Sequence, residues 1–557
     1  SYDLLIIGRQ ALTVDGPAPD LARVRDGLKV LVLEQDHDTL VSRFGFRANI
    51  HGERKAFIRA RNHPVLAGLG EVNLADWRGA ATLVPPYLET PGVETSDPRW
   101  NWMGFINTRV WRCGNRGNVA SVLIEKPPVG NFMPIVDCGF DLQYAPLLEY
   151  TEGNGRMIFC QLDVSARTSA EPAAQRLLVN LVGYLLGAQA APSRPVFYAG
   201  GGEGAGVLAS LGVDARPCDA AAPPADSVLV VGPGASEIDG LEDAVQRGLR
   251  VLCLGLGEGE MPIVLPEGLG AEKRAEVSSR ISDMTRPEYT ALSDAELHWK
   301  TKPEIAALTG VGEGGNSALA VIEKGQGRVV LCQAAPWMFD WANKTYLRTT
   351  HRRNVYLVSR LLHNLGAQAS CPLLERAAKP GQLYDWVLPA DWKGRVDRKD
   401  EGQELGWQRE DFTDTDWAPI AVPGAFDKLT PGLENYDGVF WYRLRFRVPD
   451  NLGRENVVLK LGGIDDESWV WLNGRFLGEV TKQSRPEDYW SFPREYALDG
   501  DLLRRDGANV LVVKVRDTYL SGGIMGTPRI TATAPWMNTY YVDVPESVDD
   551  PFRYYRW

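Results

Sequence analysis

The sequence contains one unit written twice, and this repetition constrains the fold more than any other feature. Each copy has two short apolar runs bounded by glycine, at 4–8 and 27–34 in the first copy and at 228–232 and 248–255 in the second. Each copy then carries Gly-Arg-x-x-x-Cys-Gln, at 155–161 and 327–333, and ends in a helical run that closes on Gly-Ala-Gln-Ala, at 187–190 and 366–369. Four anchors in the same order predict two tandem α/β domains followed by something different.

Changes in hydrophobic periodicity along the sequence indicate the domain boundaries. Apolar, β-branched runs bounded by glycine are typical of buried parallel strands, and 172–186 has the periodicity of an amphipathic helix. We therefore predict two doubly wound α/β domains, at 1–190 and 191–375. Beyond a linker, short alternating strands and the hairpin signal Asn473-Gly474 predict an all-β jelly-roll sandwich at 385–535. Residues 536–557 form an aromatic tail that we expect to dock on another surface.

The charge and the first residues of the chain bear on partners and location. A net charge of −12 over 557 residues argues against a nucleic-acid or anionic-membrane partner. No apolar run approaches about 18 residues, so we predict no membrane span. The chain enters an apolar strand directly after Ser1, without a signal peptide. We expect either a processed chain, or the C-terminal part of a longer one, or a trimmed chain, and the compartment stays open.

Cysteine, histidine and glycine patterns predict no cofactor and no metal. There are seven cysteines, and Cys160, Cys253 and Cys332 sit in apolar β-type runs, which favours buried free thiols over disulfides. Six histidines without His-Glu-x-x-His, and cysteines without Cys-x-x-Cys, do not suit zinc. The glycines at 200–202 could cradle a phosphate, but no Lys-Ser/Thr follows and a plain tight turn is favoured.

The two α/β units resemble class-I glutamine-amidotransferase-like domains. That fold carries its nucleophilic cysteine on a turn after a central strand, where this chain has Glu34-Gln35-Asp36 and Gly255-Leu256-Gly257. Cys253 comes two residues too early, so it should point into the sheet. Degenerate domains of this kind look like the trimerisation domain after the barrel of family-42 β-galactosidases. The resemblance implies a role in assembly, not chemistry, for 1–375.

The sandwich resembles the sugar-binding domain of family-2 glycoside hydrolases over about 405–530. The resemblance is carried by the segments 417–424, 436–443, 463–474, 507–517 and 521–524, in that order. In β-galactosidases of that family an Asn before a turn and an Asp after the last long strand reach the sugar. The matching residues here are Asn435 and Asp517, whose amide and carboxylate offer donors and acceptors to sugar hydroxyls.

Aromatic side chains and a further pair of carboxylates complete the candidate site. Tyr436 and Tyr519 lie on its expected rim. Trp469 and Trp471 share one strand face; they are either a sugar platform or filling of the sandwich core or an interface, and the second interpretation is favoured. The turn Asp465-Asp466 could bind Ca²⁺ or cap backbone N–H groups, and the two side chains should face opposite ways.

This chain departs from the family in ways that limit its function. The sandwich follows the α/β pair, no strand–helix unit repeats eight times, and no Asn is followed by Glu, so no catalytic pair of carboxylates is predicted. The leading hypothesis is the ancillary, sugar-binding and assembling portion of a β-galactosidase-like hydrolase. Its partners would be carbohydrate, a catalytic barrel on another segment or chain, and further copies in a homo- or hetero-oligomer. The alternative is a stand-alone carbohydrate-binding scaffold. The family habit suggests a periplasmic or secreted protein.

Overall fold

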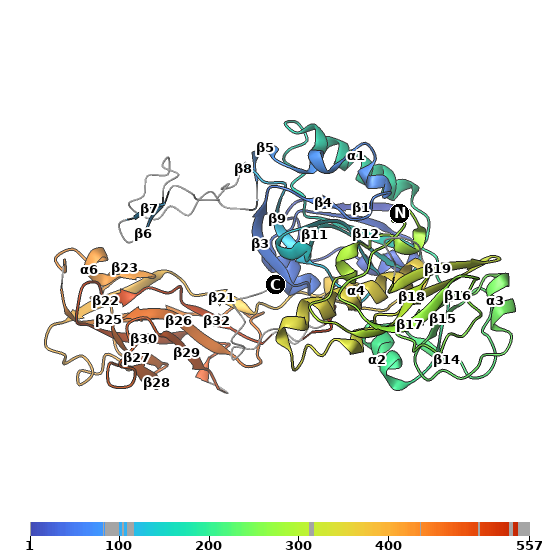
Figure 1. The fold of residues 1–557 in the computed structure, drawn as a ribbon. Helices are drawn as coiled ribbons and strands as arrows, with labels where there is room; N and C mark the ends of the chain where they lie inside the picture. The colour runs from blue at the N-terminus through green and yellow to red at the C-terminus, as the bar shows by residue number, and fades with distance from the viewer. Residues whose placement is uncertain are drawn as a thin grey trace. The chain divides into compact units, whose positions relative to one another are not determined.

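The fold is that of a computed structural model, which describes residues 2–81, 83, 100–102, 105–107, 116–310, 317–434, 436–499, 502–533 and 539–543. The chain divides into two compact units. The first is Ser1–Lys379 together with Trp536–Trp557, and the second is Pro380–Pro535. The first unit holds the two repeats and the second holds the β-sandwich (Figure 1).

The first repeat forms a mixed eight-stranded sheet. Its main path runs β1-β2-β12-β11-β10-β4, and β9 joins β11 to β3. The strands are β1 (Leu4–Ile7), β2 (Lys29–Leu33), β3 (Ala48–Glu53), β4 (Phe57–Ile58), β9 (Ala120–Glu125), β10 (Phe132–Cys138), β11 (Tyr144–Glu152) and β12 (Gly155–Cys160). β1, β2 and β12 are parallel to one another, and β11 is antiparallel to β12. The helical segments are η1 (Leu21–Asp26), η2 (Thr39–Phe44), η3 (Pro64–Leu66), η4 (Glu71–Leu74), η5 (Phe140–Leu142) and α1 (Pro172–Gly187). The two-stranded pairs β5 (Trp77–Ala80) with β8 (Arg116–Gly117) and β6 (Trp100–Trp102) with β7 (Phe105–Asn107) lie apart from this sheet.

The second repeat forms a mixed six-stranded sheet in the order β14-β13-β15-β16-β20-β19. Its strands are β13 (Val196–Ala199), β14 (Ala215–Pro217), β15 (Val228–Val231), β16 (Arg250–Leu254), β19 (Leu319–Lys324) and β20 (Gly327–Cys332), with β17 (Gly270–Ala275) and β18 (Glu304–Thr309) as a separate pair. The helices are α2 (Gly202–Ser210), α3 (Leu241–Arg247), α4 (Arg348–Asn364) and α5 (Leu373–Ala377), with the short turns η6 (Pro287–Tyr289), η7 (Asp294–Leu297), η8 (Pro336–Met338) and η9 (Thr345–Leu347). Gly202 begins α2, and Gly200, two residues earlier, has a φ of 144° that favours glycine.

Strand pairing shows that the two repeats are the same structure. β1, β2, β12 and β11 pair with one another as β15, β16, β20 and β19 do, and Leu33 lies opposite Cys160 as Leu254 lies opposite Cys332. The glycines that begin β12 and β20, Gly155 and Gly327, are also equivalent. A Cβ on Gly155 or on Gly327 would lie 2.2 or 2.1 Å from a carbonyl oxygen of the preceding helical turn, so only glycine fits there.

The equivalence extends to a stretch with little sequence similarity. η3 and η6 both begin at a proline, Pro64 and Pro287, and each is followed by a second short helical turn, η4 or η7. Asn73 accepts a hydrogen bond from the backbone N–H three residues earlier at 2.9 Å, and Glu296 does the same in the second repeat. Sequence analysis missed this pair of loops because the side chains differ and only the capping geometry is shared.

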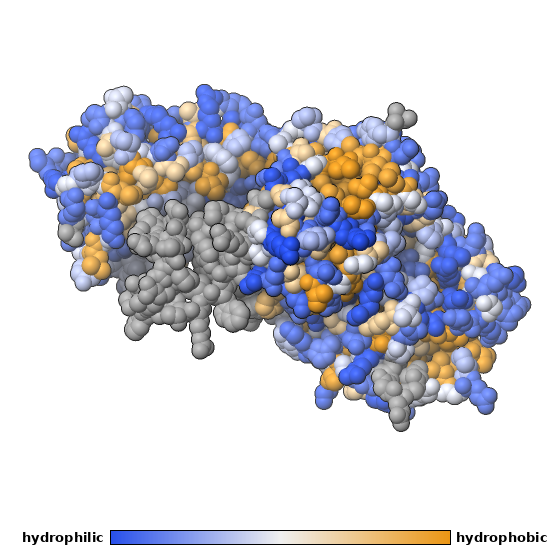
Figure 2. Space-filling model, turned by 90° about the horizontal axis from the view of Figure 1, so that it is seen from above, coloured by the Kyte–Doolittle hydropathy of each residue, from blue (hydrophilic) through white to orange (hydrophobic). Residues whose placement is uncertain are grey.

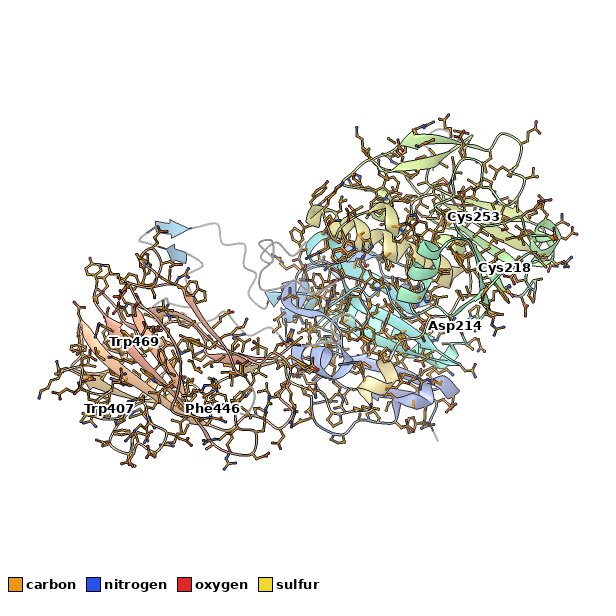
Figure 3. All side chains as sticks on the ribbon, turned by 90° about the horizontal axis from the view of Figure 1, so that it is seen from below. Asp214, Cys218, Cys253, Trp407, Phe446 and Trp469 are labelled. Carbon is orange, nitrogen blue, oxygen red and sulfur yellow. The ribbon has the colours of Figure 1, made fainter. Side chains whose placement is uncertain are left out.

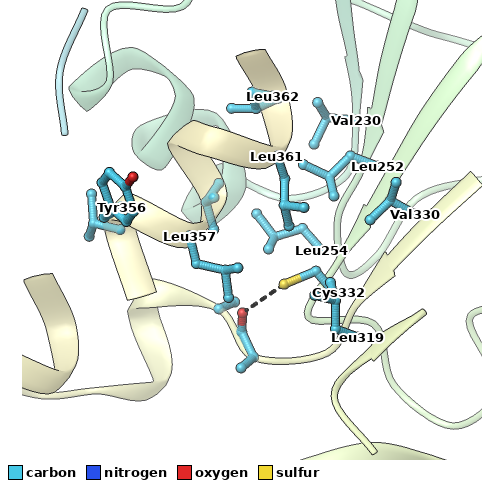
Figure 4. Close-up of a cluster of buried hydrophobic side chains, with 14 of the residues drawn as sticks. Val230, Leu252, Leu254, Leu319, Val330, Cys332, Tyr356, Leu357, Leu361 and Leu362 are labelled. Carbon is cyan, nitrogen blue, oxygen red and sulfur yellow. Dashed lines mark hydrogen bonds between the residues drawn. The ribbon is translucent and has the colours of Figure 1, made fainter. Parts of the chain in front are cut away.

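The motif cysteines are structural. Cys160 and Cys332 are both fully buried, and the Cys160 Sγ donates to the Leu162 carbonyl at 3.6 Å. The Cys332 Sγ donates to the Ala334 carbonyl at 3.4 Å (Figure 4). Burial raises the pKa of Cys332 and of Cys253 to about 12, so neither thiol ionises readily at neutral pH. The expectation that Cys160 and Cys332 are buried free thiols in strands is confirmed, and strand pairing shows that their positions are equivalent.

In the first repeat, two buried amide side chains meet at the turn that follows the central strand β2. Gln35 and Gln161 form a reciprocal pair: the Gln35 backbone N–H donates to Gln161 Oε1 and Gln161 Nε2 donates to the Gln35 carbonyl, both at 2.9 Å. Both side chains are buried. This closed hydrogen-bond pair stabilises the turn and leaves it without a reactive group.

A short segment near the C-terminus belongs to the core of the first unit. Tyr540 is fully buried among Phe44, Phe46 and Phe132, and its hydroxyl donates to the Phe44 carbonyl at 2.8 Å. Asp543 pairs with Arg47 at 3.0 Å. The chain thus returns to the first unit after the sandwich. The aromatic residues from 544 to 557, which carried the docking expectation, lie outside the described residues.

Helix α1 is apolar on more than its buried side. Leu177, Leu181 and Leu185 are buried, while Val179 and Leu186 are each 64% exposed. Seen from the side of α1, the first unit carries an apolar area among polar residues (Figure 2). An apolar helix face left in solvent is typical of a contact surface. The helices of the described part of the chain include none long and apolar enough to cross a membrane.

The second unit consists of two six-stranded antiparallel sheets. One has the order β23-β22-β25-β30-β27-β28, formed by Ala418–Ala421, Asp391–Asp397, Gly438–Phe446, Asn509–Asp517, Glu467–Leu472 and Arg475–Val480. The other has β21 (Asp385–Val387), β32 (Arg529–Thr531), β26 (Val458–Asp465), β31 (Gly523–Ile524), β24 (Gly424–Ala425) and β29 (Pro493–Ala497), and α6 (Phe426–Leu429) follows β24. Along β30, Leu511, Val513 and Val515 face the main core of the unit, while Val510 and Val512 belong to a separate aromatic cluster. This alternation by two defines an inner and an outer face of the sheet.

Candidate functional site

Carboxylates gather where several strands of the sandwich end. Asp517 ends β30 opposite Gly438, which begins β25, and Asp465 ends β26 opposite Gly523 of β31. Asp466 follows directly, and Asp427 lies in the short helix α6. Antiparallel pairing brings the ends of strands distant in sequence to one edge, and here it concentrates negative charge.

Of the two carboxylate oxygens of Asp517, one accepts a hydrogen bond and the other has no partner among the described residues. Its side chain is buried, and Oδ1 accepts a hydrogen bond from the Tyr519 backbone N–H at 3.1 Å. Among the described residues Oδ2 has no hydrogen-bond partner. Burial, and then the neighbouring carboxylates of Asp466, Asp437 and Asp427, raise the pKa of Asp517 to about 6. A buried acceptor without a partner is uncommon in proteins and suits a hydroxyl or water supplied from outside.

Asp465 and Asp466 form a carboxyl pair, contrary to the expectation that they face opposite ways. Strand alternation does not apply, because Asp466 lies between β26 and β27 and outside both. Burial and the Asp466 carboxylate, which is also its hydrogen-bond partner, raise the pKa of Asp465 to about 7. Asp466 Oδ2 accepts from Thr518 N at 2.9 Å and Thr518 Oγ1 at 2.5 Å, so it caps the turn after β30. Within the described ranges no group of three or more His, Cys, Asp or Glu is arranged to hold a metal ion.

These raised pKa values predict an unusual pH dependence for the sandwich. A carboxyl whose pKa is higher in the folded than in the unfolded state favours folding below the ordinary Asp pKa of about 4, and this stability is lost as pH rises to about 7. Asp465→Asn should therefore stabilise the unit at pH 8 relative to wild type, by about 1–2 kcal/mol after allowance for solvent screening. The difference should vanish near pH 4.

Denaturant unfolding followed by tryptophan fluorescence at several pH values measures this effect. Asp450→Asn is the control, because Asp450 is exposed and has no described ion pair. Equal pH dependence in Asp465→Asn and wild type would contradict the raised pKa.

Two of the predicted tyrosines lie near the carboxylates. Tyr436 precedes β25 and packs on Phe426 with ring centroids 6.3 Å apart, and Arg398 lies 5.1 Å over its ring. Tyr519 is 72% exposed, two residues after Asp517. The structure therefore places Asp517, Tyr436 and Tyr519 at the same end of the sandwich. Asn435 lies outside the described residues.

The structure separates Trp469 and Trp471 from this group. Trp469 and Trp471 of β27 lie opposite Lys514 and Val512 of β30, whose side chains are on the outer face of the sheet. Asp517 continues the alternate series Leu511, Val513 and Val515, whose side chains are on the inner face. Trp471 is buried and stacks on Trp441 with ring centroids 5.5 Å apart, in the cluster that also contains Trp407. Figure 3 labels Trp407 and Trp469 in this unit. Trp469 is half-buried, with the Lys514 ammonium 4.9 Å from its ring centroid. The sheet therefore lies between these two tryptophans and Asp517, which agrees with the favoured interpretation that they fill the sandwich and do not form a sugar platform.

Sequence reasoning missed the partners that make the end of the sandwich distinctive. Asp427 is buried, accepts from Ser521 Oγ at 3.4 Å through Oδ2, and has a second oxygen without a partner in the described part of the chain. The buried Tyr442 hydroxyl is likewise without a described partner. The sequence could have indicated these residues through their positions, because each lies in or next to a strand that ends at this edge of the sandwich.

The structure therefore defines a β-rich protein in which mixed α/β sheets are joined to an antiparallel sandwich with an acidic, strand-end site. No family model matches the chain. A segment of 89 residues is 28% identical to a β-glucuronidase of Paenibacillus borealis, and it covers 16% of this chain and 15% of that protein. This local similarity relates part of the chain to glycoside hydrolases.

Solved structures give partial matches of the same kind. A Bacteroides uniformis β-glucuronidase matches at 18% identity over 26% of this chain and 17% of its own, with a TM-score of 0.21. A glycosyl hydrolase family 2 member from Bacteroides cellulosilyticus matches at 18% identity over 27% of this chain and 20% of its own, with a TM-score of 0.22. The Ruminococcus gnavus β-glucuronidase solved with D-glucuronic acid matches at 19% identity over 27% and 30%, with a TM-score of 0.23. The chain spans less than a third of each of these proteins.

Proposed function

We propose that this chain is an ancillary, carbohydrate-binding and assembling part of a glycoside hydrolase, working with a catalytic barrel on another segment or another chain. One observation carries the sugar-binding half of the proposal: Asp517 has a buried oxygen without a described partner beside the exposed Tyr519. A carboxylate acceptor next to an aromatic ring matches the two surfaces of a sugar, its hydroxyls and its C–H faces. The short similarity to a β-glucuronidase supports the same class.

The proposed site consists of Asp517 and, as the sequence predicts, Asn435, with Tyr436 and Tyr519 on the rim. Trp469 and Trp471 have no part in it. Asp427 and Asp465 add acceptor oxygens, while the proton between Asp465 and Asp466 is engaged in the hydrogen bond of that pair. Acceptors outnumber donors in this set, so it suits a neutral pyranoside, which brings O–H donors, better than an anionic sugar.

Asp517→Asn should weaken binding of a β-galactoside about tenfold or more, because a hydrogen bond to a charged group contributes about 1.5–3 kcal/mol. Titration calorimetry on wild type and variant measures the change. Asp450→Asn, an exposed carboxylate of the same unit, should leave affinity unchanged. The competing interpretation is that Asp517 only caps its turn through the Tyr519 N–H. In that case the variant would lose stability while affinity stayed the same, and the site would be refuted.

The assembling half rests on the exposed apolar residues of α1, Val179 and Leu186. A stand-alone carbohydrate-binding scaffold is the second candidate, favoured by the buried amides in place of a nucleophile at Gln35 and Gln161. The composition of the particle purified from its native source distinguishes the ancillary role from the stand-alone scaffold. A co-purifying barrel of about 250 residues or more supports the ancillary role, and a particle composed of this chain alone supports the scaffold.

A further inference from the structure

A cavity of about 180 Å³ lies between the two repeats of the first unit. One wall is the segment 59–64, just before η3, and the other is 284–292, which contains η6. These walls come from the two loops that are equivalent in the repeat. Three arginines and a histidine are among the thirteen lining residues, and none of the thirteen is Asp or Glu. On a chain with a net charge of −12 this lining is conspicuously basic.

Three of the four basic side chains already contact carboxylates that do not line the cavity. Arg59 pairs with Glu296 at 2.6 Å, and His63 Nε2 lies 3.1 Å from Glu149. Arg286 pairs with Glu323 at 2.7 Å. Arg61 differs: it is exposed, and no carboxylate among the described residues lies within ion-pair distance of it. One cation is therefore left over at the cavity, beside the exposed amide of Asn62.

Hydrogen bonds hold both walls in place. Asn364 Nδ2 donates to the carbonyls of Glu288 and Thr290 at 2.8 and 3.0 Å. Directly after the opposite wall, Asn180 Nδ2 donates to the carbonyls of Val65 and Ala67 at 3.0 and 2.9 Å and so holds η3, which the wall enters at Pro64. A wall fixed before the ligand arrives loses little entropy on binding, which favours affinity in a small cavity.

We propose that this cavity binds a small organic acid through its carboxylate. The Arg61 guanidinium supplies a planar fork that matches a carboxylate, and the Asn62 amide supplies a further donor. The volume equals about six water molecules at ~30 Å³ each, enough for an acid of about three to six carbons. Pro64, Met284 and Leu292 offer apolar contact to its carbon skeleton. This proposal is independent of the carbohydrate site, because the cavity lies wholly within the first unit.

Titration calorimetry of the full chain at low ionic strength tests the proposal with matched probes. Succinate and D-glucuronate carry carboxylates, succinamide and glucose are their neutral counterparts, and inorganic phosphate is the other oxyanion. We expect saturable binding of one or both carboxylates, with a Kd on the order of 1 mM or tighter, and no binding of the neutral probes. Arg61→Gln should weaken it at least tenfold. Arg176→Gln, an exposed arginine of α1 without a described ion pair, should leave it unchanged.

A second variant locates the site independently of charge. Thr285 is exposed and lines the cavity, so Thr285→Trp should fill the cavity and abolish binding while the unfolding temperature stays near that of wild type. Binding that survives both Arg61→Gln and Thr285→Trp would overturn the proposal, since the ion would then sit elsewhere. Binding of phosphate without either carboxylate would overturn the assignment to an organic acid. Equal binding of glucose and glucuronate would overturn the role of the carboxylate.

Discussion

Arg443→Met is expected to destabilise the sandwich by about 3–5 kcal/mol, the usual result of removing one partner from a buried ion pair. The Arg443 side chain has no exposed surface, and its Nε lies 3.0 Å from Asp414 Oδ2. The same guanidinium donates to the carbonyls of Trp407, Arg409 and Phe412 at 2.5, 3.2 and 3.3 Å. One side chain thus holds the loop that covers the outer aromatic cluster, and its loss leaves several acceptors unpaired.

Denaturant unfolding measures the loss, and tryptophan fluorescence should shift to the red as Trp407 gains contact with water. Arg445→Met is a matched control on the same strand. Arg445 also reaches Asp414, at 3.5 Å, but it is 47% exposed, so its replacement should change stability by at most about 1 kcal/mol. Similar losses in the two variants would show that net charge, and not the buried geometry, accounts for the effect.

Arg59→Met should destabilise the first unit by a similar amount, about 3–5 kcal/mol. Arg59 and its partners Glu296 and Asp137 are buried, and the pairs measure 2.6 and 3.4 Å. Arg59 Nε also donates to the Ala291 carbonyl, and Nη1 donates to Ser293 Oγ, at 2.8 and 2.7 Å. Burial by itself would lower the pKa of Arg59, but Glu296 and Asp137 outweigh it and the pKa is raised. The residue comes from the first repeat and most of its partners from the second, so it joins the two.

Arg61→Met, two residues further on and exposed, is the control and should change the free energy of unfolding by less than about 0.5 kcal/mol. Adding Glu296→Leu to Arg59→Met should recover part of the loss, because one of the stranded carboxylates is removed. A double variant less stable than Arg59→Met alone would contradict the ion-pair explanation and indicate a role in packing.

The sequence by itself determined the repeat, the main strands of the repeated units and the fate of the thiols. Apolar runs bounded by glycine predict buried strands, which holds for β2, β15 and β16, whereas Ile6 of the edge strand β1 is 48% exposed. Glycines such as Gly155 and Gly327 are required where a Cβ would meet a carbonyl oxygen. Cys160 and Cys332 could be assigned as buried for the same reason, because a local apolar run fixes burial without reference to distant residues. The change to short alternating strands after the linker was equally local, and the antiparallel sheets follow from it.

Only the tertiary structure decided which residues share a site. Trp469 and Asp517 were both predicted as site residues, yet the register of β27 on β30 puts their side chains on opposite faces of one sheet. Register follows from cross-strand packing, and a shift of one residue would exchange the faces. The return of Tyr540 to the first unit's core and the cavity beside Arg61 depend on segments more than 200 residues apart. No periodicity or local propensity encodes such contacts, since they arise only when separately formed elements pack together.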